Sequence, residues 1–112
     1  MALENAPDGS TITVTESYTD NESGMLYDEN EPLRNVTLDL NGKEIQSEDG
    51  FYTGSNLLIT GNGIYGGQII QSDGTLTIEN GSYGMLLVQT GTTELNGGTF
   101  RGMTVPDDEL MN

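Results

Sequence analysis

No cysteine and no histidine occur among the 112 residues. Without cysteine the protein can form no disulfide framework, no thiolate metal site and no cysteine nucleophile. The lack of histidine removes the commonest general base and the commonest transition-metal ligand of proteins. These two absences exclude many familiar catalytic and metal-binding arrangements.

Basic residues are scarce as well. Only Arg34, Lys43 and Arg101 oppose 18 acidic residues, and the formal net charge is −15. This excess disfavours direct binding to nucleic acid or to an anionic membrane, because the attraction between phosphate and protein becomes a repulsion. It favours a basic protein or a cation as the partner.

Long apolar runs are missing, and none approaches the length needed to cross a membrane. The N-terminal segment lacks the basic region and the apolar core of a signal peptide. We therefore expect a cytoplasmic protein, located in the host cytoplasm if a phage encodes it. If the sequence is a module excised from a larger protein, an extracellular location is the alternative.

What the sequence does contain is a repeat between Val36 and Phe100. Residues 38–45, 57–64, 76–83 and 93–100 share an apolar-x-apolar pair, with threonine in the last copy, then a Gly/Asn corner and another apolar residue. The matching positions of the four copies are Leu40, Ile59, Ile78 and Leu95. A repeat of about 19 residues with three inward positions predicts a three-sided parallel β-helix of about four coils.

The inward side chains of this β-helix are predicted from the period-two alternation. They are Val36, Leu38, Leu40, Ile45, Phe51, Leu57, Ile59, Ile64, Ile69, Leu76, Ile78, Tyr83, Val88, Thr93, Leu95, Phe100 and Val105. Residues 11–16 also alternate and predict a strand that forms an incomplete first copy. Asn-Gly pairs at 41–42, 62–63, 80–81 and 96–97 suit corners with positive φ.

Residues 17–34 interrupt the repeat and predict an acidic loop. We expect residues 25–27 to cap the open end of the core while the acids stay in solvent, or the loop to contact a partner; the two are compatible. A weak calcium site within residues 20–31 stays open, although no segment matches an EF-hand loop. The prediction is a single domain, with the strand and cap loop at 1–34, coils at 35–105 and an acidic tail at 106–112.

Residues 35–45 and 8–15 carry a family resemblance. Asn-Val-Thr-Leu-Asp-Leu-Asn-Gly-Lys-Glu-Ile resembles the opening coil of right-handed parallel β-helix proteins of the pectate-lyase-like class, especially coils of bacterial surface proteins. The resemblance implies a right-handed solenoid. Enzymes of this class use acidic metal ligands with a basic residue, or paired aspartates, on one strand face. In this sequence Lys43 is the only basic residue between Arg34 and Arg101, so the resemblance implies the fold and not the activity.

Two motifs resemble catalytic or binding sites but are better interpreted as structure. Residues 61–66 match GxGxxG, but a strand and a turn follow where a dinucleotide site needs a helix. Asp39, Glu79 and Glu94 are outward carboxylates that stacking could bring together as a glycosidase pair. They are also ordinary outward positions of strands. We expect no enzyme activity, no metal and no cofactor.

Charge and hydrophobicity point instead to partner binding. The first half of the sequence holds most of the acids, and the runs at 69–70 and 85–88 leave apolar side chains for an outer strip with Tyr52 and Met103. The residues predicted to contact a partner are Asp20, Glu22, Asp28, Glu29, Glu31, Glu44, Glu48, Asp49, Tyr27, Ile70, Met85 and Leu87. The strip or the C-terminal coil could also form a homodimer.

Two functions remain open at this stage. The first is a non-catalytic inhibitor, a small acidic nucleic-acid mimic of the anti-CRISPR or anti-restriction type found in phage, which would block a basic nuclease or another nucleic-acid-binding enzyme. Size, charge and the missing signal peptide favour it. The alternative is a β-helix module of a bacterial surface or adhesin protein that contacts carbohydrate or another protein, which the family resemblance favours.

Overall fold

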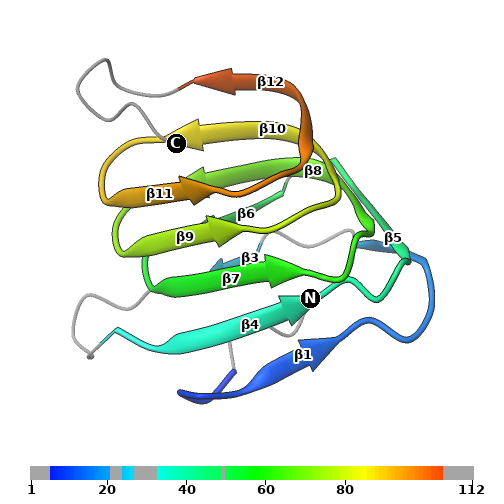
Figure 1. Ribbon diagram of the computed structural model, residues 1–112, viewed down its shortest axis with the longest axis horizontal. Helices are drawn as coiled ribbons and strands as arrows, with labels where there is room; N and C mark the ends of the chain where they lie inside the picture. The colour runs from blue at the N-terminus through cyan, green and yellow to red at the C-terminus, as the bar shows by residue number, and fades with distance from the viewer. Residues whose placement is uncertain (1–5, 21–23, 27–32, 49, 105–112) are drawn as a thin grey trace.

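The computed structural model describes residues 6–20, 24–26, 33–48 and 50–104. In these residues the protein is all-β, and its parallel strands stack as a solenoid of about four turns. Successive turns rise in a right-handed path from β1 at one end to β12 at the other (Figure 1). Each turn crosses from one sheet to the other and returns one strand further along the stack.

The first sheet, here called the front sheet, has five parallel strands in the order β1-β4-β7-β9-β11. Its strands are β1 (Thr11–Thr13), β4 (Asn35–Asp39), β7 (Asn56–Thr60), β9 (Thr75–Ile78) and β11 (Thr92–Leu95). Alternating burial in β4 and β7 follows the alternating apolar pattern of the sequence. The front sheet thus buries one face and leaves the other towards solvent.

The second sheet, the back sheet, has the order β12-β10-β8-β5-β2, with β3 and β6 alongside. Its strands are β2 (Tyr18–Asp20), β3 (Gly24–Leu26), β5 (Glu44–Ser47), β6 (Phe51–Thr53), β8 (Ile64–Gln71), β10 (Ser82–Val88) and β12 (Thr99–Thr104). The long strand β8 pairs with β5 along its first half and with β6 along its second half. The second and third sides of the solenoid therefore share one sheet.

The segment predicted to interrupt the repeat instead contains part of the first turn. Residues 18–20 pair with β5, and residues 24–26 pair with β6, both in parallel register. Leu26 is fully buried in the core. It therefore lies in the wall of the solenoid, in a strand, and the prediction of one uninterrupted cap loop over residues 17–34 was wrong for these two strands. Tyr27 lies outside the described residues.

Of the predicted inward residues that the structure describes, Ile64 alone is exposed; the core also contains Leu26 and Leu86, which the prediction did not include. Ile64 was predicted to point inward, but it is 43% exposed, and Tyr65 is buried in its place. Tyr65 pairs in register with Ile45 and Tyr83, both buried. The corner from Ile59 to Tyr65 is one residue longer than the matching corner from Ile78 to Tyr83, so alternation after the corner starts on the opposite face. Val105 lies outside the described residues.

The register of the first two full copies also differs from the sequence alignment. Ile59 was aligned with Leu40, but it pairs with Leu38, two positions earlier on β4. The later alignments of Ile59 with Ile78 and of Ile78 with Leu95 are confirmed. A shift of two residues keeps every side chain on its predicted face, so the apolar pattern cannot detect it.

The Asn-Gly corners adopt positive φ at three of the four sites. Asn41 and Gly42 have φ of 53° and 70°, Asn62 has 51° and Gly81 has 105°. At the last corner the positive φ falls on Gly98 instead, one residue after the predicted pair. The tight turns that the sequence predicts are therefore present, with the left-handed residue displaced at the C-terminal one.

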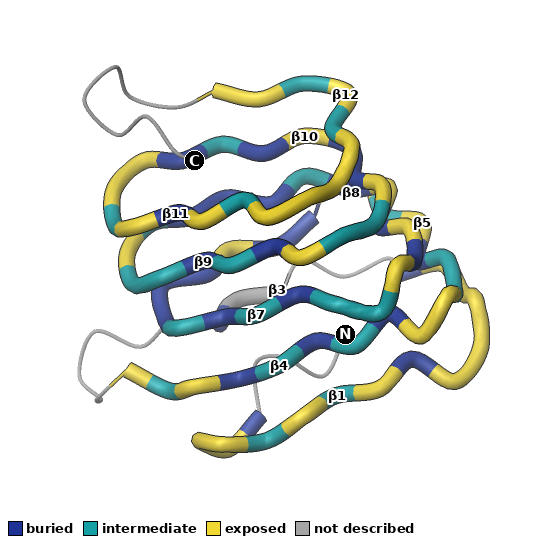
Figure 2. Tube along the Cα trace, viewed as in Figure 1, coloured by how far each residue is buried: buried dark blue, intermediate teal, exposed yellow. Residues whose placement is uncertain are grey.

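Burial changes from the middle of the stack to its two ends. The inward residues Ile12, Leu95 and Phe100 are only partly buried, and Tyr18 and Met103 are exposed (Figure 2). At the N-terminal end a hollow of about 290 Å³ is lined by residues of β1 and its continuation, together with Tyr18 and Leu38. In the described residues, no helix is long and apolar enough to span a membrane.

Candidate partner-binding surfaces

The outer face of the back sheet carries a row of apolar side chains. Tyr52, Ile70 and Leu87 pair in register on the neighbouring strands β6, β8 and β10; we call these three residues the apolar column. They face outward because the residues just before them, Phe51, Ile69 and Leu86, are buried in the core. The predicted apolar strip is present at these positions.

Exposure varies along this strip. Tyr52 is 40% exposed, Leu87 is half-buried and Ile70 is only 8% exposed, between its two neighbours in the column. Met85, two residues before Leu87 on the same face, is 42% exposed. The prediction of Ile70 as an accessible partner contact was therefore wrong: it fills the centre of the column, and Tyr52 and the neighbouring Met85 supply most of the accessible apolar surface.

Met103 does not belong to this strip. It pairs in register with the inward-facing Leu86, and it is exposed because the described strands end at β12. The prediction that Met103 extends the outer strip was wrong. Its exposure is a property of the end of the stack.

The residues predicted as acidic partner contacts divide into three groups. Asp20 is only 6% exposed, so its prediction as an accessible partner contact was wrong. It lies two residues after Tyr18 on β2. The partial burial of Tyr18 raises the Tyr18 pKa, and the charge of Asp20 adds a smaller contribution. Glu48 is exposed and Glu44 is half-buried, with Glu44 Oε2 accepting a hydrogen bond from Gln46 Nε2. The remaining predicted contacts lie outside the described residues: Glu22, Asp28, Glu29, Glu31, Asp49 and Tyr27.

The outward carboxylates of the front sheet are not register partners on neighbouring strands. Asp39 pairs with Thr60 on β7. Because Ile59 pairs with Ile78, the next residues, Thr60 and Glu79, are also opposite each other, and Thr60 lies between the two carboxylates. Glu94 pairs with Thr77 in a different row. Among the described residues, no three His, Cys, Asp or Glu side chains gather as a metal site.

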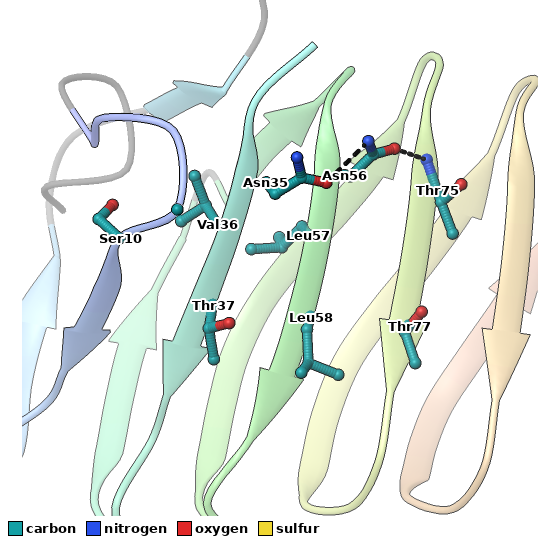
Figure 3. A pocket seen from close by; sticks show the side chains of 10 residues that line it. Ser10, Asn35, Val36, Thr37, Asn56, Leu57, Leu58, Thr75 and Thr77 are labelled. Atoms are coloured by element: carbon teal, nitrogen blue, oxygen red, sulfur yellow. Dashed lines mark hydrogen bonds between the residues drawn. The ribbon is translucent and has the colours of Figure 1, made fainter.

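A shallow groove crosses the outer face of the front sheet, where it measures about 250 Å³. Figure 3 shows side chains from β4, β7 and β9 around it, with amide and hydroxyl groups at one end and Leu58 between Thr37 and Thr77. The polar side chains are presented at the spacing of neighbouring strands, about 4.8 Å. Such a surface can hydrogen-bond to an extended polar ligand.

An amide ladder borders this groove, and sequence reasoning missed it. Asn56 Nδ2 donates to Asn35 Oδ1 at 3.1 Å, and Asn56 Oδ1 accepts from the Thr75 backbone N–H at 3.1 Å. Asp8 Oδ1 accepts from both the backbone and the side chain of Asn35, and these hydrogen bonds lower the Asp8 pKa. The signal in the sequence was an asparagine directly before each of Val36 and Leu57.

Comparisons with family models, with curated proteins and with solved structures found no match to this protein. The resemblance to pectate-lyase-like coils therefore remains a prediction for the family, whereas the solenoid itself is observed.

Proposed function

We propose that the protein is a non-catalytic binding module that contacts a basic partner through the apolar column. The observation that supports the proposal is the registered row of Tyr52, Ile70 and Leu87 on a rigid sheet, with Met85 beside it. Aromatic and methionine side chains are enriched at protein interfaces. On a surface this acidic, an apolar row supplies short-range contact after charge has brought the partner close.

The partner class that we propose is a nuclease or another nucleic-acid-binding enzyme, with this protein as its inhibitor. A net charge of −15 supports this, because such enzymes present a basic groove to their substrate. Glu44 is the first residue of β5, and Glu48 directly follows β5, in the segment that leads to β6 and Tyr52. The described carboxylates do not repeat like phosphates, so the support comes from total charge and not from a matched row.

The test is inhibition of DNA cleavage by a panel of purified restriction and RNA-guided nucleases. A Tyr52→Ser, Met85→Ser double variant should weaken inhibition at least about tenfold, as expected when two interface anchors are lost. Ile64→Ser is the matched control, because Ile64 is a similarly exposed apolar residue on β8 outside the column. It should change inhibition less than about twofold, within the range of neutral contacts.

Rising salt should weaken any inhibition that depends on charge. Inhibition that ignores salt would contradict the acidic mimic, and equal losses in the column variant and in Ile64→Ser would contradict the column as the contact site. Sedimentation at increasing protein concentration separates a foreign partner from a second copy of this protein on the column or on the last turn.

A second function is favoured by the groove on the front sheet. Its amide and hydroxyl groups and its regular strand spacing suit an extended carbohydrate, as expected for a surface module. A glycan array probed with the wild-type protein and with Thr37→Val, Thr77→Val tests this function. Signal lost in the double variant and kept in the Tyr52→Ser, Met85→Ser variant would support the carbohydrate site. No signal from the wild-type protein would count against it.

A further inference from the structure

The four Asn-Gly corners of the solenoid share one chemistry and differ in their surroundings. In an Asn-Gly pair the glycine backbone nitrogen can attack the carboxamide carbon of the asparagine. A new C–N bond forms to the glycine nitrogen, the original amide C–N bond breaks and ammonia leaves; water then opens the cyclic imide to aspartate or isoaspartate. The reaction needs no partner other than water, so the structure around each corner decides how readily it proceeds.

Asn41 and Asn80 are held by their neighbours. Asn41 Nδ2 donates to the Val14 carbonyl at 3.1 Å, and the backbone nitrogen of Gly42, which would be the attacking group, donates to the Gly61 carbonyl at 2.7 Å. Asn80 Oδ1 accepts from the Asn62 backbone N–H at 2.7 Å. Attack at Asn41 must first release the Gly42 nitrogen from its hydrogen bond, and the hydrogen bond at Asn80 holds its carboxamide in one orientation.

Asn62 is less restrained, but it lies inside the stack. Its backbone N–H is tied to Asn80. The next residue, Gly63, is buried, whereas Gly97 at the last corner is exposed, although an added Cβ would lie about as close to the preceding turn at both glycines, 2.4 Å from the Lys43 carbonyl oxygen and 2.5 Å from that of Glu79. Because turns lie on both sides of this corner, its rearrangement requires the middle of the solenoid to open.

Asn96 lies at the corner between β11 and β12, the last described strands of the two sheets. Its backbone N–H donates to the Ile78 carbonyl at 2.9 Å, which fixes the corner to the preceding turn. Gly97 is exposed, and among the described residues the Asn96 side chain has no hydrogen-bond partner. Among the described strands this turn has a neighbouring turn on one side, so its local opening should cost less than opening an inner repeat.

We propose that Asn96 is a deamidation site of the folded protein, favoured over the three other Asn-Gly corners by its place at the end of the stack. The product has a defined neighbour. Since Leu95 pairs with Ile78, the next outward residues are Asn96 and Glu79 on adjacent turns. Conversion of Asn96 to aspartate therefore places a second carboxylate beside Glu79, and like charges in register destabilise strand pairing.

The test is to incubate the folded protein in mildly alkaline buffer and follow each corner by peptide mass spectrometry. Asn96 should convert at least about tenfold faster than Asn41, Asn62 or Asn80, which corresponds to about 1.4 kcal/mol in the local opening free energy. A parallel sample in concentrated urea gives the intrinsic reactivity of each dipeptide. The same order and ratio of rates in urea and in buffer would overturn the proposal, as would conversion of Asn41, Asn62 or Asn80 at the same rate as Asn96.

A second experiment tests the consequence at Glu79. Asn96→Asp should lower the midpoint of thermal unfolding by roughly 1–4 °C, whereas the uncharged control Asn96→Ser should lower it less. Adding Glu79→Gln to Asn96→Asp should restore most of the loss. No restoration would show that the two side chains do not interact and would refute the predicted neighbour. These readouts are independent of any partner and therefore of the proposed function.

Discussion

One column of inward side chains shows how much the middle of the solenoid differs from its ends. Ile12, Leu38, Ile59, Ile78 and Leu95 follow one another in register across the front sheet. The three central residues are completely buried, while the first and last are only partly buried. Similar aliphatic residues in the same motif therefore have different surroundings, because burial depends on having a turn on both sides.

The back sheet shows the same contrast with larger side chains. Tyr18, Ile45, Tyr65, Tyr83 and Phe100 form one registered column. The three central residues are buried, Tyr18 is 40% exposed and Phe100 is partly buried although it stacks on Tyr83 with ring centroids 5.1 Å apart. The ends of the stack keep the residue types of the core and lose its protection.

The largest expected effect tests this comparison directly. Leu38→Ala should destabilise the fold by about 2–5 kcal/mol, because it leaves a cavity in a fully buried column. The same change at the partly buried Leu95 should cost about half as much or less, since the end can relax and less area is lost. Urea unfolding of both variants measures the difference. Equal losses would mean that the ends are as well packed as the middle.

Two glycines give a smaller contrast. A Cβ on Gly84 of β10, opposite the bulge of β8, would lie 2.6 Å from the carbonyl oxygens of Gly66 and Gly67, so Gly84→Ala should cost about 1–3 kcal/mol. On Gly102 in the last strand a Cβ would meet only the flexible end of Met85, and Gly102→Ala should stay within about 0.5 kcal/mol. Thermal unfolding of the pair distinguishes a rigid inner turn from an adaptable outer one. A large loss at Gly102 would contradict it.

The smallest expected effect is a dependence on pH. Burial raises the Tyr83 pKa, and the Tyr83 hydroxyl donates to the Asn80 carbonyl. The stability linked to this raised pKa is fully present below the unfolded value of about 10 and decreases as pH rises above it. Tyr83→Phe should cost about 1 kcal/mol at neutral pH through the lost hydrogen bond. Its unfolding midpoint should then depend less on alkaline pH than that of the wild type or of Tyr18→Phe; parallel curves would refute the assignment to Tyr83.

The solenoid was predictable because apolar alternation and Asn-Gly corners repeat along most of the sequence. The prediction failed where strand register or corner length, which differ from one turn to the next, decides how residues pair or face. Leu38 pairs with Ile59 because the register is shifted by two residues, and the alternation of apolar and polar residues cannot reveal such a shift. The same register brings Asn35 and Asn56 together in a hydrogen bond. Ile64 is exposed because the corner after Ile59 contains one extra residue. A prediction that assumes the same corner length in every copy cannot place this residue correctly.

The candidate surfaces were predictable to different degrees. Surplus apolar residues at 69–70 and 85–88 predicted the outer strip, and register made Tyr52, Ile70 and Leu87 one column. Asp20 was misassigned because composition cannot show that one carboxylate of an acidic segment becomes part of a strand with little solvent access. The groove of the front sheet was missed because it is formed by residues from several different turns.

The parallel pairing of every described strand also constrains how the protein acquires its structure. Ladder partners always come from successive turns, and the described strands contain no hairpin that could form early from neighbouring segments. Loop-closure entropy must therefore be overcome before the first pair of strands forms, which slows folding in proteins dominated by non-local contacts. During synthesis at about 5–20 residues per second, each turn waits roughly one to a few seconds for the next to cover it. A new turn that pairs with its register shifted by two residues still buries its apolar face, so apolar burial alone does not select the register. The amide ladder of Asn35 and Asn56 helps the strands to select the correct register, because its hydrogen bond joins residues that are opposite each other in that register.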